Sequence, residues 1–181
     1  SKTDDDKSWD ITRDLIGFAG LLTQENHREY DSLLSGKTLE DFAEFSKKLK
    51  TEILSAEKEI SKQAEDFFRI VDREGLDQKC FNRGSLFNYF DKLRSSVYPG
   101  SWNAQWQTDI ENKPLYSNSV LADKKSCLDR CQPEIVDLFF ATRSGIFRVE
   151  YLKEILKNLS QLSLLNEISR EIMEIKQERS L

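Results

Sequence analysis

The sequence is poor in the residues that build metal centres and disulfide frameworks. Its 181 residues include one histidine and three cysteines. A structural zinc site needs about four ligands, and a small, odd number of cysteines does not match the disulfide frameworks of small secreted domains. We therefore expect no metal site, no cofactor and free thiols at Cys80, Cys127 and Cys131. A disulfide bond from Cys80 to Cys127 or Cys131 is the alternative if the protein is secreted.

Glycine and proline are also scarce, with seven and three copies. Folds made of many short strands need many turns that contain these two residues. A hydrophobic fraction of 38% with a charged fraction of 33% suits a helical protein better. The sequence therefore predicts a mainly all-α fold.

Long apolar runs and an excess of basic residues are absent as well. No run approaches the roughly 20 apolar residues that span a bilayer. The net charge of -5 argues against a general affinity for nucleic acid or anionic lipid. We expect a soluble protein that neither inserts into a membrane nor binds nucleic acid. Its few cysteines favour the cytoplasm, with an extracellular or cell-surface location as the alternative.

The chain carries none of the short motifs that mark common catalytic sites. There is no nucleophile elbow, Gly-rich phosphate loop, zinc-protease helix or calcium loop. The single histidine, His27, lies among polar residues and is best interpreted as solvated. With a third of the residues charged, neighbouring carboxylates arise without any acid-base role. We predict that the protein is not an enzyme and has no catalytic residues.

Residues 38–72 carry the clearest helical pattern. Their apolar residues follow one another at steps of three or four, which places them on one face of a helix about 50 Å long. Thr38 and Asp41 resemble a capping box at its start, and Gly75 follows its end. The apolar positions are Phe42, Phe45, Leu49, Ile53, Ala56, Ile60, Ala64, Phe67 and Val71.

A second long helix is predicted over residues 149–178. Its apolar spacing contains one shortened interval, a stammer in a heptad pattern. We expect the two long helices to pack antiparallel in an elongated bundle, and the same stripes would also serve to join chains into homo- or hetero-oligomers. The apolar positions of this second helix are Leu152, Ile155, Leu159, Leu162, Leu165, Ile168, Ile172 and Ile175.

Shorter helices are expected to complete a single domain over residues 9–181. Residues 1–8 are an acidic lead, natural or left by cloning. Pro133 suits the first turn of a helix, and Gly145 indicates a break before the second long helix. The predicted short helices cover 9–34, 85–97, 120–131 and 134–142.

Residues 138–149 allow a minor β-hairpin as an alternative, because aromatic and β-branched residues flank the turn-like triplet Arg143-Ser144-Gly145. Within it, Leu138 to Arg148 resembles the strand-turn-strand of Cache-type extracellular sensor domains. A heptad helix rather than more strands follows. Neither the fold nor the small-ligand binding of that family is carried over. The phenylalanines of this stretch, Phe139, Phe140 and Phe147, are expected in the core rather than in a cofactor site.

Residues 98–119 form the predicted irregular loop, in which turn residues alternate with tryptophans. Loops this long inside a compact domain usually pack back or have a function. Trp102 and Trp106 are therefore candidate partner-binding residues, with capping of the bundle core as the alternative. Arg143 and Arg148 could pair with acids on the long helices or with an acidic partner. We predict a protein-protein interaction domain: a scaffold, adaptor or tether in a larger assembly. The alternative is an extracellular receptor-binding or ligand-sensing helical domain.

Overall fold

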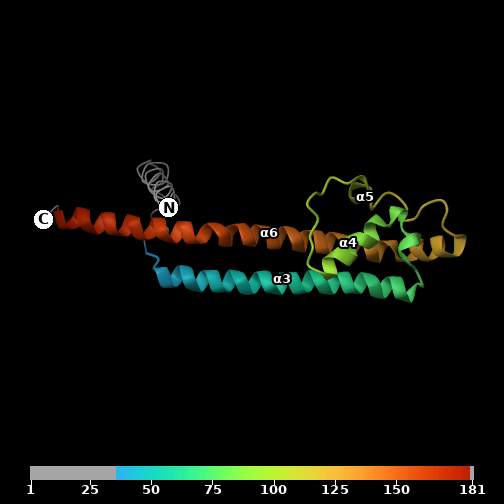
Figure 1. Cartoon of the computed structure of the whole chain (residues 1–181), viewed down its shortest axis with the longest axis horizontal. Helices are drawn as coiled ribbons and strands as arrows, with labels where there is room; N and C mark the ends of the chain where they lie inside the picture. Colours follow the sequence, from blue (N-terminus) through green and yellow to red (C-terminus); the bar gives the residue numbers. More distant parts are fainter. Residues whose placement is uncertain (1–35, 180–181) are drawn as a thin grey trace, which may run out of the picture. The chain divides into compact units, whose positions relative to one another are not determined.

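The computed structural model describes residues 36–179, apart from the side chain of Lys176, and within this range it contains helices and no strand (Figure 1). The predicted all-α fold is therefore confirmed. The acidic lead, the helix predicted over 9–34 and His27 lie outside the described residues. The helices are α3 (Leu39–Arg73), α4 (Ser85–Arg94), α5 (Gln105–Thr108) and α6 (Ala122–Arg179), with short 3-10 turns η2 (Gln78–Cys80) and η3 (Asn82–Gly84).

Helix α3 begins and ends where its sequence predicts. The Thr38 amide donates to Asp41 Oδ2 at 2.8 Å and the Asp41 amide donates to Thr38 Oγ1 at 3.2 Å, which completes the expected capping box. At the other end Gly75 has a φ of 59°, and the Leu76 amide donates to the Val71 carbonyl at 2.8 Å. This left-handed glycine and its backbone bond form a Schellman stop.

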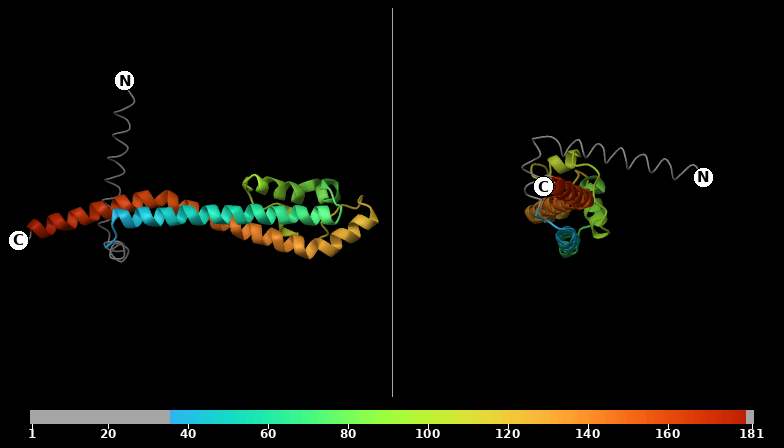
Figure 2. Two further views of the ribbon diagram at one scale, coloured as in Figure 1. Left: turned by 90° about the horizontal axis from the view of Figure 1, so that it is seen from below. Right: turned by 90° about the vertical axis from the view of Figure 1, so that its left-hand side faces the viewer.

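Helix α6 corrects three predictions at once. The helices predicted over 120–131, 134–142 and 149–178 are one continuous helix, so the minor hairpin near 138–149 is wrong. Pro133 lies inside α6 rather than at the first turn of a new helix. Figure 2 shows α6 changing direction in its yellow and orange part. Pro133 accounts for such a bend, because proline lacks an amide hydrogen and its ring displaces the preceding turn.

Gly145 allows close helix packing instead of breaking the chain. A Cβ atom at Gly145 would lie 2.9 Å from Cγ1 of Ile60 on α3, a separation that real side chains do not tolerate. Ile60 is buried. The glycine therefore lets the two helices approach each other at this point, a need that a single sequence does not distinguish from a helix stop.

The chain divides into two compact units, and the division falls within both long helices. One unit contains residues 50–153, and the other contains the described residues 36–49 and 154–179. In the second unit Phe42 and Leu49 of α3 and Leu159 of α6 are buried. The single domain over 9–181 stays a prediction.

In the unit of residues 50–153, α3 and α6 run antiparallel and α4 packs against both. Ion pairs join Arg73 to Glu134 at 2.8 Å and Glu52 to Arg148 at 2.8 Å, so the chain directions are opposed. The rings of Phe67 on α3 and Phe90 on α4 stack at 4.1 Å. The fully buried side chains of this core include Phe67, Phe90, Phe139, Ile60, Ile70, Leu93, Leu128, Ile135, Ile146 and Val149.

Candidate functional site

The loop between α4 and α6 packs back on the core. The Asn82 amide donates to the Leu115 carbonyl at 2.7 Å, and Gln132 Nε2 on α6 donates to the Lys113 carbonyl at 3.0 Å. Ile110 and Leu115 are buried. Apart from α5 the loop has no regular structure, as predicted, yet it holds its two tryptophans in fixed places.

Trp106 belongs mainly to the interior. Its ring centroid lies 5.7 Å from that of Tyr89 and 5.6 Å from that of Phe139, both in edge-to-face geometry. Phe139 is fully buried and Tyr89 nearly so. Such pairs contribute about 0.5–1.5 kcal/mol each beyond their buried area. The half-buried Trp106 therefore caps the core, which was the alternative interpretation of the loop tryptophans.

Trp102 is half-buried, like Trp106, and its ring lies tilted against Phe147 of α6. Its centroid is 5.0 Å from that of Phe147, and the Arg143 guanidinium lies 5.5 Å from the Trp102 centroid and 5.6 Å from the Phe147 centroid. Phe147, which we expected in the core, is 44% exposed. The structure thus brings together two predicted site residues, Trp102 and Arg143, and adds Phe147, which sequence reasoning had assigned to the interior.

Tyr151 extends this surface by one helical turn. Residues 143, 147 and 151 are spaced by four, so they lie one above another on the same face of α6. Tyr151 is 68% exposed. We call Trp102, Arg143, Phe147 and Tyr151 the aromatic-arginine patch. The spacing of four residues between positions 143, 147 and 151 can be seen in the sequence, but it places them on one face only if residues 138–151 are helical.

A buried hydrogen bond supports the patch from beneath. The Tyr89 hydroxyl and Thr142 Oγ1 are 2.9 Å apart, and Thr142 Oγ1 also donates to the Phe139 carbonyl at 2.9 Å. Burial raises the pKa of Tyr89 to about 12, although the hydrogen bond to Thr142 and the charge of Arg143 oppose the rise. Tyr89 is therefore a neutral structural group that fixes the helix carrying Arg143.

Tyr98 lies at the start of the loop, with Lys153 Nζ 5.7 Å from its ring centroid. Its hydroxyl oxygen is buried and has no hydrogen-bond partner in the part of the chain that the structure describes. Burial raises its pKa, and the negative charge of Glu57 adds to that effect. A buried hydroxyl without a partner costs about 1–3 kcal/mol, which makes this position a weak point of the loop.

Arg148, the fourth predicted site residue, does not join the patch. Its Nη2 donates to Glu52 Oε2 on α3 at 2.8 Å. Arg148 comes five positions after Arg143, which at about 100° per residue turns it to the other side of α6. Arg143 differs in having no carboxylate within ion-pair distance among residues 36–179. Its charge remains available to another molecule.

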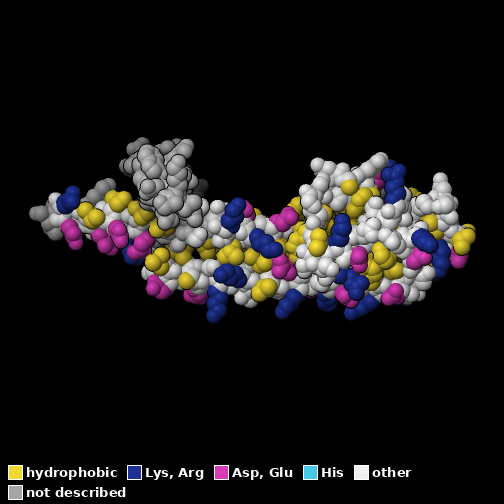
Figure 3. All heavy atoms as spheres, in the orientation of Figure 1, with side chains coloured by type: hydrophobic (Ala, Val, Ile, Leu, Met, Phe, Trp, Pro, Cys, Tyr) yellow, Lys and Arg dark blue, Asp and Glu magenta, His cyan; other side chains and the backbone are white. Residues whose placement is uncertain are grey.

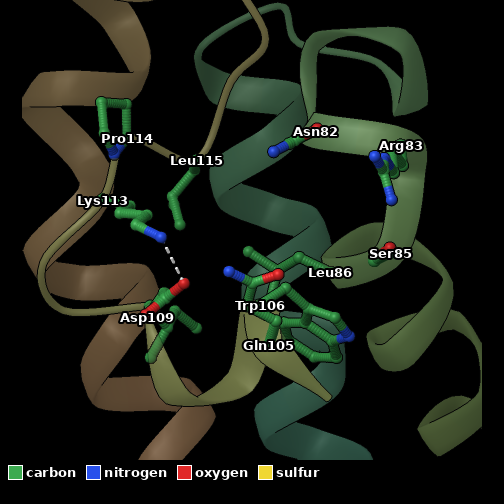
Figure 4. A pocket seen from close by; sticks show the side chains of 11 residues that line it. Asn82, Arg83, Ser85, Leu86, Gln105, Trp106, Asp109, Lys113, Pro114 and Leu115 are labelled. Atoms are coloured by element: carbon green, nitrogen blue, oxygen red, sulfur yellow. Dashed lines mark hydrogen bonds and ion pairs between the residues drawn. The ribbon is translucent and has the colours of Figure 1, made fainter.

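A pocket lies beside Trp106, between the loop and the start of α4 (Figure 4). Its volume is about 350 Å³. Trp106, Leu86 and Leu115 provide apolar walls. The rim carries the Arg83 side chain and an ion pair between Lys113 Nζ and Asp109 Oδ2 at 2.6 Å.

The cysteines and acidic residues build no metal centre in the described part of the chain. All three cysteines are free thiols, with Cys80 and Cys131 buried and Cys127 half-buried. Burial raises the pKa of Cys131 to about 11. No group of three or more His, Cys, Asp or Glu side chains within residues 36–179 is arranged to hold a metal ion.

Fold and patch together define a mainly α-helical protein with a surface patch that combines the exposed Phe147 and Tyr151 with the half-buried Trp102 and Arg143. No protein-family model matches the chain, and neither the curated proteins nor the solved structures contain a match to it. Within residues 36–179, every helix is too short or too polar to cross a lipid bilayer.

Proposed function

We propose that the protein is a protein-protein interaction domain, a scaffold or adaptor, and that it binds its partner through the aromatic-arginine patch. The observation that carries this proposal is the cluster of the half-buried Trp102 and Arg143 with the exposed Phe147. Tryptophan, tyrosine and arginine dominate the energetic centres of protein interfaces. Exposed aromatic groups gathered in one place are typical of interaction sites rather than of free surface.

The geometry of this cluster suits binding. Arg143 lies against two aromatic rings, and the loop that carries Trp102 is tied to the core further along the chain, where the Asn82 amide donates to the Leu115 carbonyl. Side chains that are ordered before binding lose less conformational entropy when a partner arrives. Arg143 supplies a charge that orients a carboxylate or carbonyl of the partner, while Phe147 and Tyr151 supply apolar contact area.

Photo-cross-linking from two positions of α6 tests this proposal. A benzophenone amino acid replaces Tyr151, within the patch, or Ala141, which is exposed on another side of the same helix. In native extract we expect a discrete cross-linked partner from position 151 and none from position 141. The same partner captured equally from both positions, or from position 141 alone, would contradict binding through the patch.

The pocket beside Trp106 favours a second candidate function, the sensing of a small ligand. Its volume of about 350 Å³ is at the lower end of ligand sites, which run from about 300 to 1,000 Å³. An aromatic wall and an arginine at the rim suit a small aromatic carboxylate. Titration with indole-3-carboxylate should then quench tryptophan fluorescence. Arg83→Asn should weaken the quenching, because it removes the guanidinium. Asn is the suitable replacement, since it tolerates the φ of 54° found at Arg83. An unchanged titration curve excludes this use of Arg83.

A further inference from the structure

The C-terminal part of α6 has two apolar faces. Leu159 and Asn166, seven residues apart, are both buried, and Asn166 Nδ2 donates to the Lys37 carbonyl at 2.7 Å just before α3. These residues mark the face that α6 turns toward residues 36–49. At about 100° per residue, the apolar residues that follow lie on the opposite side. The stammer predicted from the sequence is therefore the point where the apolar pattern changes face.

This opposite face, which we call the second stripe, is incompletely covered. Leu164 is 55%, Ile172 41% and Ile175 47% exposed, and Leu165 and Ile168 are half-buried. From Leu165 onward the spacing is three, four and three residues, the spacing of positions a and d in a coiled coil. Such a seam is the surface that one helix offers to another.

Acidic residues follow one edge of the second stripe. Glu167, Glu171, Glu174 and Glu178 are spaced by four, three and four residues, so they form a single row. Figure 3 shows hydrophobic side chains above a row of acidic ones toward the C-terminal end of the chain. Arg170 contacts Glu167 and Glu174. Like charges three or four residues apart destabilise an isolated helix by about 0.2–0.5 kcal/mol per pair. Arg170 offsets this repulsion at Glu167 and Glu174. Glu171 and Glu178 form no ion pair within residues 36–179, so they favour a partner that brings positive charge.

We propose that the second stripe binds an amphipathic helix of a partner protein whose edge is basic. Apolar positions a and d provide the contact area, and the glutamate row selects the charge of the partner. A second copy of the chain would present the same acidic row. Residues 9–34 of the same chain contain two arginines against five carboxylates, which is the wrong sign. The second stripe shares no residue with the aromatic-arginine patch, and the proposal goes beyond the function proposed above.

Two designed peptides test the proposal on the full chain. Both are 21 residues long with Ile at a and Leu at d, and they differ only in having Lys or Glu at e and g. By isothermal titration we expect the lysine peptide to bind and the glutamate peptide to bind at least about tenfold more weakly. Glu171→Lys with Glu178→Lys should reverse this preference. Ile168→Asp with Ile172→Asp should abolish binding, whereas Met173→Asp, which alters an exposed apolar residue outside the stripe, should not.

A second copy of the chain, or residues 9–34 of the same chain, bound to the second stripe would give different results in these experiments. Light scattering that shows a concentration-dependent dimer, dissolved by Ile172→Asp, would assign the stripe to a second copy. Lysine-peptide binding that appears only after Phe18→Asp with Leu22→Asp would assign it to residues 9–34. Equal binding of both peptides, or of neither, also overturns the proposal. If the variant with Ile168→Asp and Ile172→Asp fails to fold, the peptide preference of the variant with Glu171→Lys and Glu178→Lys decides alone. Phe147→Ala, measured in parallel, should bind the lysine peptide like the wild type, which separates this result from the function of the aromatic-arginine patch.

Discussion

Tyr89 connects the core to the surface patch, and its ionisation gives a pH dependence with a definite sign. Its pKa in the folded chain is about 12, above the value of about 10 expected in the unfolded chain. A raised folded pKa contributes stability that is fully present below about pH 10 and is lost as the pH rises toward about 12. The free energy of unfolding should therefore fall over this interval.

Urea unfolding at pH 8 and pH 11 measures this loss, with Tyr89→Phe as the matched control. The variant loses the hydrogen bond to Thr142 and should be less stable at pH 8 by about 1 kcal/mol. Because it cannot ionise, it should lose less stability between the two pH values than the wild type does. Equal losses in both proteins would mean that Tyr89 does not resist ionisation.

The three thiols should differ in reactivity. Cys127 is half-buried, whereas Cys80 and Cys131 are buried and burial raises the pKa of both. Because the thiolate is the reactive form, iodoacetamide at pH 8 should label Cys127 first in the folded chain, and all three should react in urea. Peptide masses identify the labelled residue. Labelling of Cys131 as fast as Cys127 in native buffer would contradict the packing of α6.

The Tyr98 hydroxyl is the one polar group of the loop for which removal should help. Tyr98→Phe deletes a buried oxygen that has no partner among residues 36–179. We expect the free energy of unfolding to stay the same or to rise by about 1 kcal/mol. Chemical denaturation measures it, and a loss of more than about 1 kcal/mol would show that the hydroxyl has a partner after all.

At the scale of elements, Gly145 decides how closely α3 and α6 pack. In an exposed helix, Gly→Ala gains about 1 kcal/mol from propensity. At position 145 the new methyl group would lie 2.9 Å from Ile60 Cγ1, and overpacking of this kind costs about 1–3 kcal/mol. Gly145→Ala should therefore lower the midpoint of thermal unfolding, whereas Ser144→Ala, at an exposed neighbour, should not. A stabilised Gly145→Ala variant would contradict the close contact.

Much of the element pattern could be predicted from the sequence. The pattern over 38–72 matches α3, and the pattern over 85–97 matches α4 to within three residues. These predictions succeed because caps and apolar spacing are local. The prediction fails in α6, because Pro133 and Gly145 resemble residues that start or end a helix. Pro133 bends α6 without ending it, and the role of Gly145, a close approach to Ile60, depends on a helix distant in the sequence.

At the scale of the whole molecule, the candidate site was only partly predictable. Trp102 and Arg143 could be selected from residue type and loop context, but their neighbour Phe147 looked like a core residue. Whether an aromatic residue is covered depends on which loop residue reaches it, and spacing along the chain does not contain that information. Arg148 shows the same limit, since its ion pair with Glu52 joins residues far apart in the sequence.

The most direct test of the patch is the affinity of its partner, once cross-linking has identified it, for four variants of the full chain. Phe147→Ala and Arg143→Ala should each raise the Kd by about tenfold or more, which corresponds to about 1.4 kcal/mol, and change the Tm little. Trp106→Ala should chiefly lower the Tm, and Arg148→Ala should leave the Kd unchanged. Binding as tight as wild type in a folded Phe147→Ala variant, or a loss in Arg148→Ala as large as in Arg143→Ala, would contradict the proposed interface.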